Sequence, residues 1–254
     1  MRPFFVPFDE STPALLSSTG IMKKIIAISL TLFTLGVTAF AQDLTTINPL
    51  SVPKIAVSAD KPDGFAPAGW KVEETITGDL NGDGKPDSAI KLAQIDASKE
   101  SGIGGSRVLV IAFNEDGHLK RVAVAAKLLQ CVDCGGAFYG VMPAPAGVTI
   151  EKGVIVVENE HGSRDVSTST FRFRYDPKAD RITLIGYDYI DRDRLTGNGW
   201  NESTNYATNS RITSIYKGKR TTTKRSVIKP TKIYIEDADG DAIEGQALHR
   251  LGLD

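Results

Sequence analysis

The sequence predicts an all-β domain made of antiparallel sheets, arranged as a sandwich or as part of a propeller, with few short helices. Apolar and polar residues alternate in 70–76 and 89–95, which is typical of half-buried strands. Turn-forming pairs, such as Asp-Gly at 116–117 and Lys-Gly at 152–153, recur between such stretches. Short strands separated by turns indicate a sheet-based domain, in which the acidic loop 79–87 closes the first hairpin.

The remaining strands follow from further apolar runs. The run RVLVIAF at 107–113 is continuously apolar after its first residue, and three aromatic residues share one face of 170–175. The only candidates for short helices are 122–130, which overlaps the apolar run 119–129, and 243–251. A hairpin that turns at 152–153 is expected at 148–157. The other expected strands are 119–129, 182–189, 211–216, 221–228 and 232–235.

Residues 1–41 carry the features of an export signal. A positive stretch at 22–24 precedes an apolar run at 25–37, and Ala-Phe-Ala at 39–41 matches the small-x-small cleavage rule. The run is too short for a transmembrane helix. Because the signal is complete from Met22, we expect Met22 to be the true start; an unusually long region before the apolar run is the alternative. The signal predicts a periplasmic or secreted protein without a membrane span after its removal.

After the signal, we expect an extended linker at 42–67 and a single β-rich domain at 68–254. The linker is rich in Pro, Ser, Thr and Asp and lacks periodicity. The whole chain has 30 basic and 31 acidic residues, and the signal contains three of the basic and two of the acidic ones, which leaves a formal charge of −2. Such a near-neutral chain gives no electrostatic reason to bind nucleic acid or a membrane surface.

Cys131 and Cys134 are the two cysteines of the chain. An exported chain meets an oxidising compartment, so a local disulfide between them is expected. Two other interpretations stay open. A zinc site would need two more ligands, and the three histidines are not paired at ligand spacing. A redox pair would lie at a strand-to-helix junction, whereas two glycines follow Cys134 directly.

The loop DLNGDGKPD at 79–87 has the residue types and spacing that wrap a hard cation. A glycine at loop position 6 allows the sharp turn, and Lys85 at position 7 offers its backbone carbonyl. Such a loop predicts bound Ca²⁺, although Asn-Gly and Asp-Gly pairs also form tight turns without a metal. The side-chain donors, at positions 1, 3, 5 and 9, are Asp79, Asn81, Asp83 and Asp87.

An EF-hand does not explain this loop. An EF-hand places a bidentate Glu at position 12 between two helices, but position 12 is Ile90 and strands are expected on both sides. Instead, GDLNGDGKPDSAI at 78–90 resembles the FG-GAP/VCBS-type repeat of integrin-like β-propellers. The resemblance implies Ca²⁺ coordination by the side chains of Asp79, Asn81, Asp83 and Asp87 and by the carbonyl of Lys85.

The resemblance covers one copy, residues 72–117, in which LVIAFNEDG at 109–117 is similar to the outer half of such a repeat. A propeller repeats its blade about four to eight times, so a single copy favours a compact sheet or sandwich with one propeller-like hairpin. The segments 131–136 and 203–206 are also similar to parts of small exported bacterial proteins of unknown function.

Two functions are compatible with these features. The first is a non-catalytic exported module whose Ca²⁺-bound hairpin is held rigid to recognise a protein or a glycan. The second is a periplasmic or secreted hydrolase of glycan or cell-wall material, with Glu158, Glu160 and Asp165 as candidate acids. His161, Ser163 and Asp165 are adjacent in sequence, but triad members normally come from separate elements. We find no catalytic constellation, so the non-catalytic module is the preferred hypothesis.

Three weaker signals have ordinary explanations. The acidic cluster 236–241 is expected to be a solvated turn, with a second cation loop as the alternative. The basic stretch 217–225 lacks interleaved aromatic residues, so a polar loop and strand face are expected rather than a nucleic-acid track. Trp200 is expected in the core, and a glycan-stacking residue is the alternative.

Overall fold

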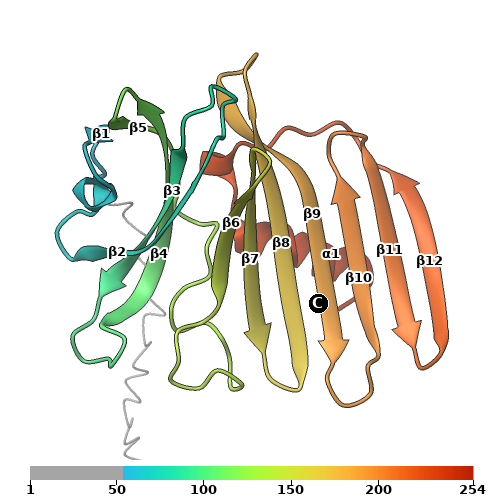
Figure 1. Cartoon of the computed structure of the whole chain (residues 1–254). Coiled ribbons are helices and arrows are strands. Elements are labelled where there is room, and N and C mark those ends of the chain that lie inside the picture. Colours follow the sequence, from blue (N-terminus) through green and yellow to red (C-terminus); the bar gives the residue numbers. More distant parts are fainter. Residues whose placement is uncertain (1–53, 254) are drawn as a thin grey trace, which may run out of the picture. The chain divides into compact units, whose positions relative to one another are not determined.

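The computed structural model describes residues 54–253, and within them twelve strands form two antiparallel sheets (Figure 1). The architecture confirms the all-β prediction, with one α-helix and two short 3-10 helices among the described residues. The predicted signal segment 1–41 and the first part of the expected linker, 42–53, lie outside the described residues.

The first sheet has five strands in the order β1-β5-β4-β3-β2. A 3-10 helix, η1 (Pro62–Phe65), lies between its first two strands in the chain. Its strands are β1 (Ser58–Ala59), β2 (Trp70–Gly78), β3 (Asp87–Ile95), β4 (Ile103–Glu115) and β5 (His118–Ala125).

Residues 54–67 were expected to belong to the linker, and this expectation is wrong, because they are part of the folded domain. β1 pairs with β5, and Ile55 and Phe65 are 4% and 1% exposed. These two side chains cover apolar residues of β3 and β4 in a small core. Scattered apolar residues without periodicity gave no sign of this role, because each of them fills a site made by a distant strand.

The second sheet has seven strands in the order β12-β11-β10-β9-β8-β7-β6, so every strand pairs with its neighbours along the chain. Strand β12 is exposed along its whole length, and its basic residues form the polar strand face expected for 217–225. The strands are β6 (Ala146–Glu151), β7 (Val154–Gly162), β8 (Asp165–Asp176), β9 (Arg181–Asp193), β10 (Gly199–Asn205), β11 (Ser210–Lys217) and β12 (Arg220–Val227).

The helix α1 (Gly240–Leu251) crosses one face of the second sheet, behind β7 to β10 in Figure 1. Asp239 caps its N-terminus by accepting a hydrogen bond from the N–H of Ala242. At its C-terminus Gly252 adopts a left-handed conformation with φ +71°. The buried Glu202 of β10, 0% exposed, accepts hydrogen bonds from Arg250 and thereby ties the helix to the sheet.

Two expected elements are wrong. Residues 122–125 continue strand β5 rather than starting a helix at 122–130, because their alternate side chains complete the edge of the main core. The expected strand 232–235 forms only an isolated bridge between Thr183 and Tyr234 and then enters the 3-10 helix η2 (Ile235–Asp237).

The inner strands β3 and β4 of the first sheet are buried on both faces, which explains the continuous apolar run at 108–113. Leu109 and Ile111 of β4 face the main core, which the first sheet shares with β6 to β9 and α1. Val108 and Val110 face the small core beneath η1. Successive side chains of a strand point to opposite faces, so both sets must be apolar.

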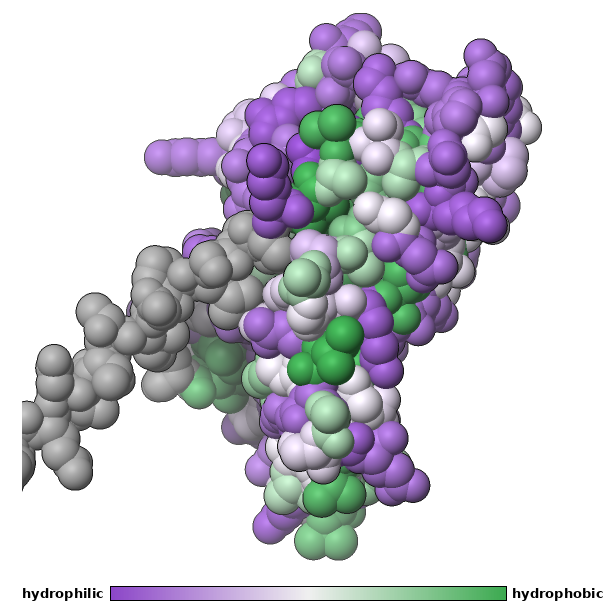
Figure 2. Space-filling model, turned by 90° about the vertical axis from the view of Figure 1, so that its left-hand side faces the viewer, coloured by the Kyte–Doolittle hydropathy of each residue, from purple (hydrophilic) through white to green (hydrophobic). Residues whose placement is uncertain are grey.

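Apolar groups on the side of the molecule shown in Figure 2 lie in a narrow band flanked by hydrophilic residues. Isolated exposed apolar side chains are normal on protein surfaces. We therefore assign no docking role to this side.

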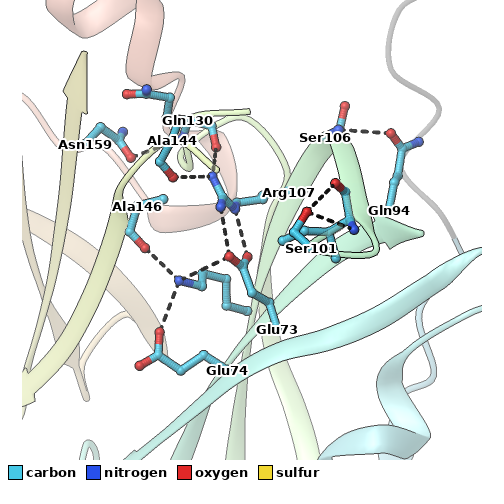
Figure 3. Close-up of polar contacts among 12 residues, drawn as sticks. Glu73, Glu74, Gln94, Ser101, Ser106, Arg107, Gln130, Ala144, Ala146 and Asn159 are labelled. Carbon is cyan, nitrogen blue, oxygen red and sulfur yellow. Dashed lines mark hydrogen bonds and ion pairs between the residues drawn. The ribbon is translucent and has the colours of Figure 1, made fainter. Parts of the chain in front are cut away.

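A buried ionic network joins the first sheet to the chain entering β6 (Figure 3). The Arg107 guanidinium, on a residue 2% exposed, forms two hydrogen bonds with Glu73, at 2.7 and 2.8 Å. Its remaining nitrogen donates to the carbonyls of Gln130 and Ala144, at 3.1 and 2.9 Å. Because its buried donors have partners, this arginine connects β4 to the chain entering β6 and offers no free group to a ligand.

Lys91 of β3 completes the network. Its ammonium lies 3.1 Å from Glu74 and 3.8 Å from Glu73, and it donates to the Ala146 carbonyl at 2.9 Å (Figure 3). A bulge between Val72 and Glu74 leaves Glu73 as the extra residue of β2. The bulge interrupts the usual alternation of side chains, so both glutamates reach the same lysine.

Cys131 and Cys134 lie at disulfide distance, with their Cα atoms 5.2 Å apart, as expected. The glycines that follow allow this segment to approach the β7–β8 turn. Gly136 has φ +78°, and a Cβ there would lie 2.8 Å from the carbonyl oxygen of Gly162. The pair of cysteines thus belongs to a loop that is fixed against the second sheet.

Candidate cation-binding loop and adjacent groove

The predicted cation loop connects the two strands of a β-hairpin. Strands β2 and β3 pair up to Gly78 and Asp87, so residues 79–86 form the turn. Gly82 and Gly84 have φ +84° and +82°, a region that side-chain-bearing residues rarely adopt. The two glycines therefore permit the reversals that the loop needs.

Asp79 organises the first half of the loop. Its Oδ1 accepts a hydrogen bond from the N–H of Gly82 at 2.7 Å, and its Oδ2 accepts one from the N–H of Gly84 at 3.0 Å. The side chain therefore lies on the inside of the turn, where the resemblance to Ca²⁺ loops requires the first ligand.

Asn81 and Asp83 each accept one hydrogen bond from the backbone N–H two residues ahead. Asn81 Oδ1 accepts from the N–H of Asp83 at 2.9 Å, and Asp83 Oδ1 accepts from the N–H of Lys85 at 2.8 Å. The ammonium of Lys85 lies 2.8 Å from Asp116, and this hydrogen bond raises the pKa of Lys85. Of the polar groups of Lys85, only its backbone carbonyl is thus a candidate ligand for a cation.

Asp87 closes the loop at its base and is 0% exposed. One of its oxygens accepts from the N–H of Leu80 and the other from the N–H of Asn114, both at 2.9 Å. The residue therefore joins the loop to β4, in addition to any part that it takes in binding a cation.

The donor chemistry of the loop fits Ca²⁺. All donors are oxygens, and each carboxylate oxygen keeps a second lone pair after accepting one N–H. Within residues 54–253, no three Asp, Glu, His or Cys side chains are grouped as a metal cluster. This holds for Asp79, Asp83 and Asp87 of the loop as well, so coordination there would also need the Asn81 amide oxygen and the Lys85 carbonyl.

A groove of about 490 Å³ runs beside the loop. Residues 79–82 form one wall, and Lys152, Arg174 and Tyr175 of the second sheet lie on the other side. The two sheets approach closely here because Gly78 has no side chain: a Cβ at this position would lie 2.5 Å from a methyl group of Ile150.

The groove carries both signs of charge and an aromatic ring, which suits a polar ligand. Asp79 lies on one side, with Lys152 and Arg174 on the other. Tyr175 is held in place by its hydroxyl, which donates to Asp180 at 2.7 Å, and by an edge contact with Phe113. Sequence reasoning missed these residues, because their only common feature is a place at the ends of strands that meet in space.

The three hydrolase candidates do not lie on one face: Glu158 and Glu160 are two residues apart on β7 and share a face, whereas Asp165 lies on the other. Glu160 pairs across the sheet with Thr168, and His161 with Ser167, so the two neighbours project from opposite faces of β7. Glu160 contacts Tyr139 and Arg194 on the face away from α1. Asp165, in contrast, lines a cavity together with His161 on the helix side.

The acidic cluster 236–241 is a helix start and not a solvated turn. Glu236 and Asp237 pair with Arg181, at 2.6 and 3.0 Å. Asp239 is the N-cap of α1, and Asp241 lies in its first turn. The glycine of this segment, Gly240, begins the helix instead of reversing the chain.

Within the described residues, no helix is long and apolar enough to cross a membrane. The chain matches no model of a known protein family and no curated protein sequence. The resemblance to FG-GAP/VCBS-type repeats therefore depends on the loop residues themselves.

Proposed function

We propose that this protein is an exported, non-catalytic β module in which the loop 79–87 binds Ca²⁺ and the adjacent groove recognises a protein or a glycan. The observation that carries the proposal is the arrangement of Asp79, whose two oxygens accept the N–H groups of Gly82 and Gly84. This arrangement places the first carboxylate inside the turn, where a cation would be coordinated.

The bound cation would supply positive charge to a loop that has little of its own. Asp79, Asp83 and Asp87 repel one another, and the ammonium of Lys85, within the loop, is already paired with Asp116. Coordination would be shared by Asp79, Asn81, Asp83, Asp87 and the carbonyl of Lys85. Binding to the folded state alone would also raise the free energy of unfolding.

The loop forms a wall of the groove, and this links cation binding to recognition. A fixed position for residues 79–82 would fix the distance between Asp79 and the cationic side chains of Lys152 and Arg174. Preorganisation of this kind lowers the entropic cost of binding a ligand. Export agrees with the signal-like segment 1–41 and with the cysteines at disulfide distance.

A two-dimensional ¹H–¹⁵N NMR titration with CaCl₂ tests the proposal at the level of single residues. We expect saturable shifts of the Gly82, Gly84 and Lys85 amides, with a Kd on the order of 10⁻⁴–10⁻³ M as in other extracellular modules. Asp83→Asn should weaken binding. Asp176→Asn is the matched control, because Asp176 makes a similar turn by accepting the N–H of Lys178 outside the loop. Loop amides that do not respond, or an equal response in Asp83→Asn, would refute the proposal.

A further inference from the structure

The face of the second sheet that carries α1 contains a cavity of about 340 Å³. Strand pairing aligns His161 with Ser167, Ser167 with Asp191, and Asp191 with Trp200. These four side chains therefore form a row across β7, β8, β9 and β10. The row is set by the register of long antiparallel strands, which makes it a rigid site.

The cavity has one polar and one apolar wall. Trp200, together with Leu248 of α1 and Leu253 beyond its end, supplies apolar surface. The polar wall consists of the hydroxyl, imidazole and carboxyl groups of Asp165, Ser167, Asp191, His161 and Glu244. A ligand of this cavity must therefore be amphipathic.

Hydrogen bonds hold the polar wall in place. Glu244 lies 2.7 Å from His161 Nε2 and accepts from the Ser169 hydroxyl at 2.7 Å. Ser167 donates to Asp191 at 2.9 Å and lies 3.1 Å from the Tyr189 hydroxyl. Glu244 and Asp191 are thus positioned by neighbours from two strands, β7 and β8.

The charge of the lining is negative. Among the described residues that line the cavity there is no lysine or arginine, and the histidine is paired with Glu244. Two carboxylates, Asp165 and Asp191, remain without a cationic partner in the lining. Burial raises the pKa of Asp191, and the nearby carboxylates of Asp165 and Glu244 act in the same direction, while the Ser167 hydroxyl and His161 lower it.

We propose that this cavity binds a small primary alkylammonium ion, with the ammonium on Asp191 and Asp165 and the alkyl chain against Trp200 and Leu248. A carboxylate that takes an ammonium donor forms a charge-assisted hydrogen bond, and an indole attracts cations to its face. An anionic ligand would meet two uncompensated carboxylates. A neutral sugar would satisfy the hydrogen bonds and leave the charge unbalanced.

Tryptophan fluorescence of the full purified chain tests this site directly. The chain has two tryptophans, so a Trp70→Phe background isolates the emission of Trp200. We expect n-pentylammonium to change that emission saturably, while 1-pentanol and methyl β-glucopyranoside, its neutral counterparts, do not. Loss of the charge in Asp191→Asn should weaken binding about tenfold or more, since bonds to charged groups are the strong ones.

Asp188→Asn is the matched control, because Asp188 lies on the same strand and pairs with Arg172 on the opposite face of the sheet. It should leave the affinity unchanged. Asp165→Asn gives a second test at the rim of the cavity if Asp191→Asn lowers the folded fraction. The proposal is overturned if pentylammonium has no effect, if pentanol or the glucoside binds as well, or if both aspartate variants bind normally. The inference does not depend on the calcium loop.

Discussion

The β2–β3 loop and the segment that starts α1 have similar compositions, and they fold differently. Both combine closely spaced aspartates with glycine. In the loop, Gly82 and Gly84 have positive φ and reverse the chain. In the second segment Gly240 is helical, and a Cβ there would lie 3.0 Å from the carbonyl oxygen of Leu128. The position of glycine, rather than the number of aspartates, distinguishes a cation-type loop from a helix start.

The two segments also differ in how their charges are compensated. Arg181 neutralises Glu236 and Asp237 before α1. The carboxylates of the loop are compensated mainly by backbone N–H groups, as for Asp79 and Asp87. This difference is the reason to propose a cation at the loop alone, and it can be tested at both places.

The largest effect is expected for Asp87→Ala. The substitution leaves the N–H groups of Leu80 and Asn114 without their acceptor and should lower the free energy of unfolding by about 3–5 kcal/mol, with or without calcium. Urea denaturation in EDTA measures this loss. Asp83→Ala is the control in the same loop, and its exposed side chain should cost less than about 1 kcal/mol under these conditions. Equal losses would contradict the assignment of Asp87 as the base of the loop.

A smaller effect is expected at the helix. Asp239→Ala removes the N-cap of α1 and should cost about 1 kcal/mol, measured by the same denaturation. Asp239→Ser retains a capping oxygen and should recover most of this loss. A cost that depends on calcium would show instead that the helix start is also a cation site.

The smallest effect concerns pH. The hydrogen bond to Glu244 raises the pKa of His161 above its ordinary value of 6.5, with Asp241 and Asp191 adding to the same shift. The resulting stabilisation is complete below pH 6.5 and is lost as the pH rises through the raised pKa. The melting temperature of His161→Gln should therefore depend less on pH between pH 6 and about 8 than that of the wild type. His118→Gln, at an exposed position, is the control; an unchanged slope in His161→Gln would contradict the pairing.

Local features of the fold were predictable, because each depends on adjacent residues. The expected turns occur after β4, β6 and β8, where Asp116, Lys152 and Asp180 have φ of +53°, +50° and +50°. The expected apolar face of 170–175 is also present, since Phe171 and Phe173 are 0% exposed. Turn chemistry and side-chain alternation are properties of the sequence itself.

Features that depend on distant residues were missed. Strand β10 contains Trp200 as its one large apolar residue and is held by β9 and β11 on both sides. His161 and Glu244 are 83 positions apart and meet only because α1 crosses the sheet. The cavity beside them has no local signal, whereas the loop 79–87 contains all its donors within nine residues.

The most direct measurement of the central claim is a thermal melt of the purified protein in EDTA and in 5 mM CaCl₂, with Asp83→Asn and Asp241→Asn beside the wild type. For a Kd of about 10⁻⁴–10⁻³ M, calcium should stabilise the wild type by about 1–2 kcal/mol. The account predicts that Asp83→Asn loses this gain and that Asp241→Asn keeps it. Identical wild-type melts, or a gain that Asp83→Asn retains, would contradict calcium binding by the loop.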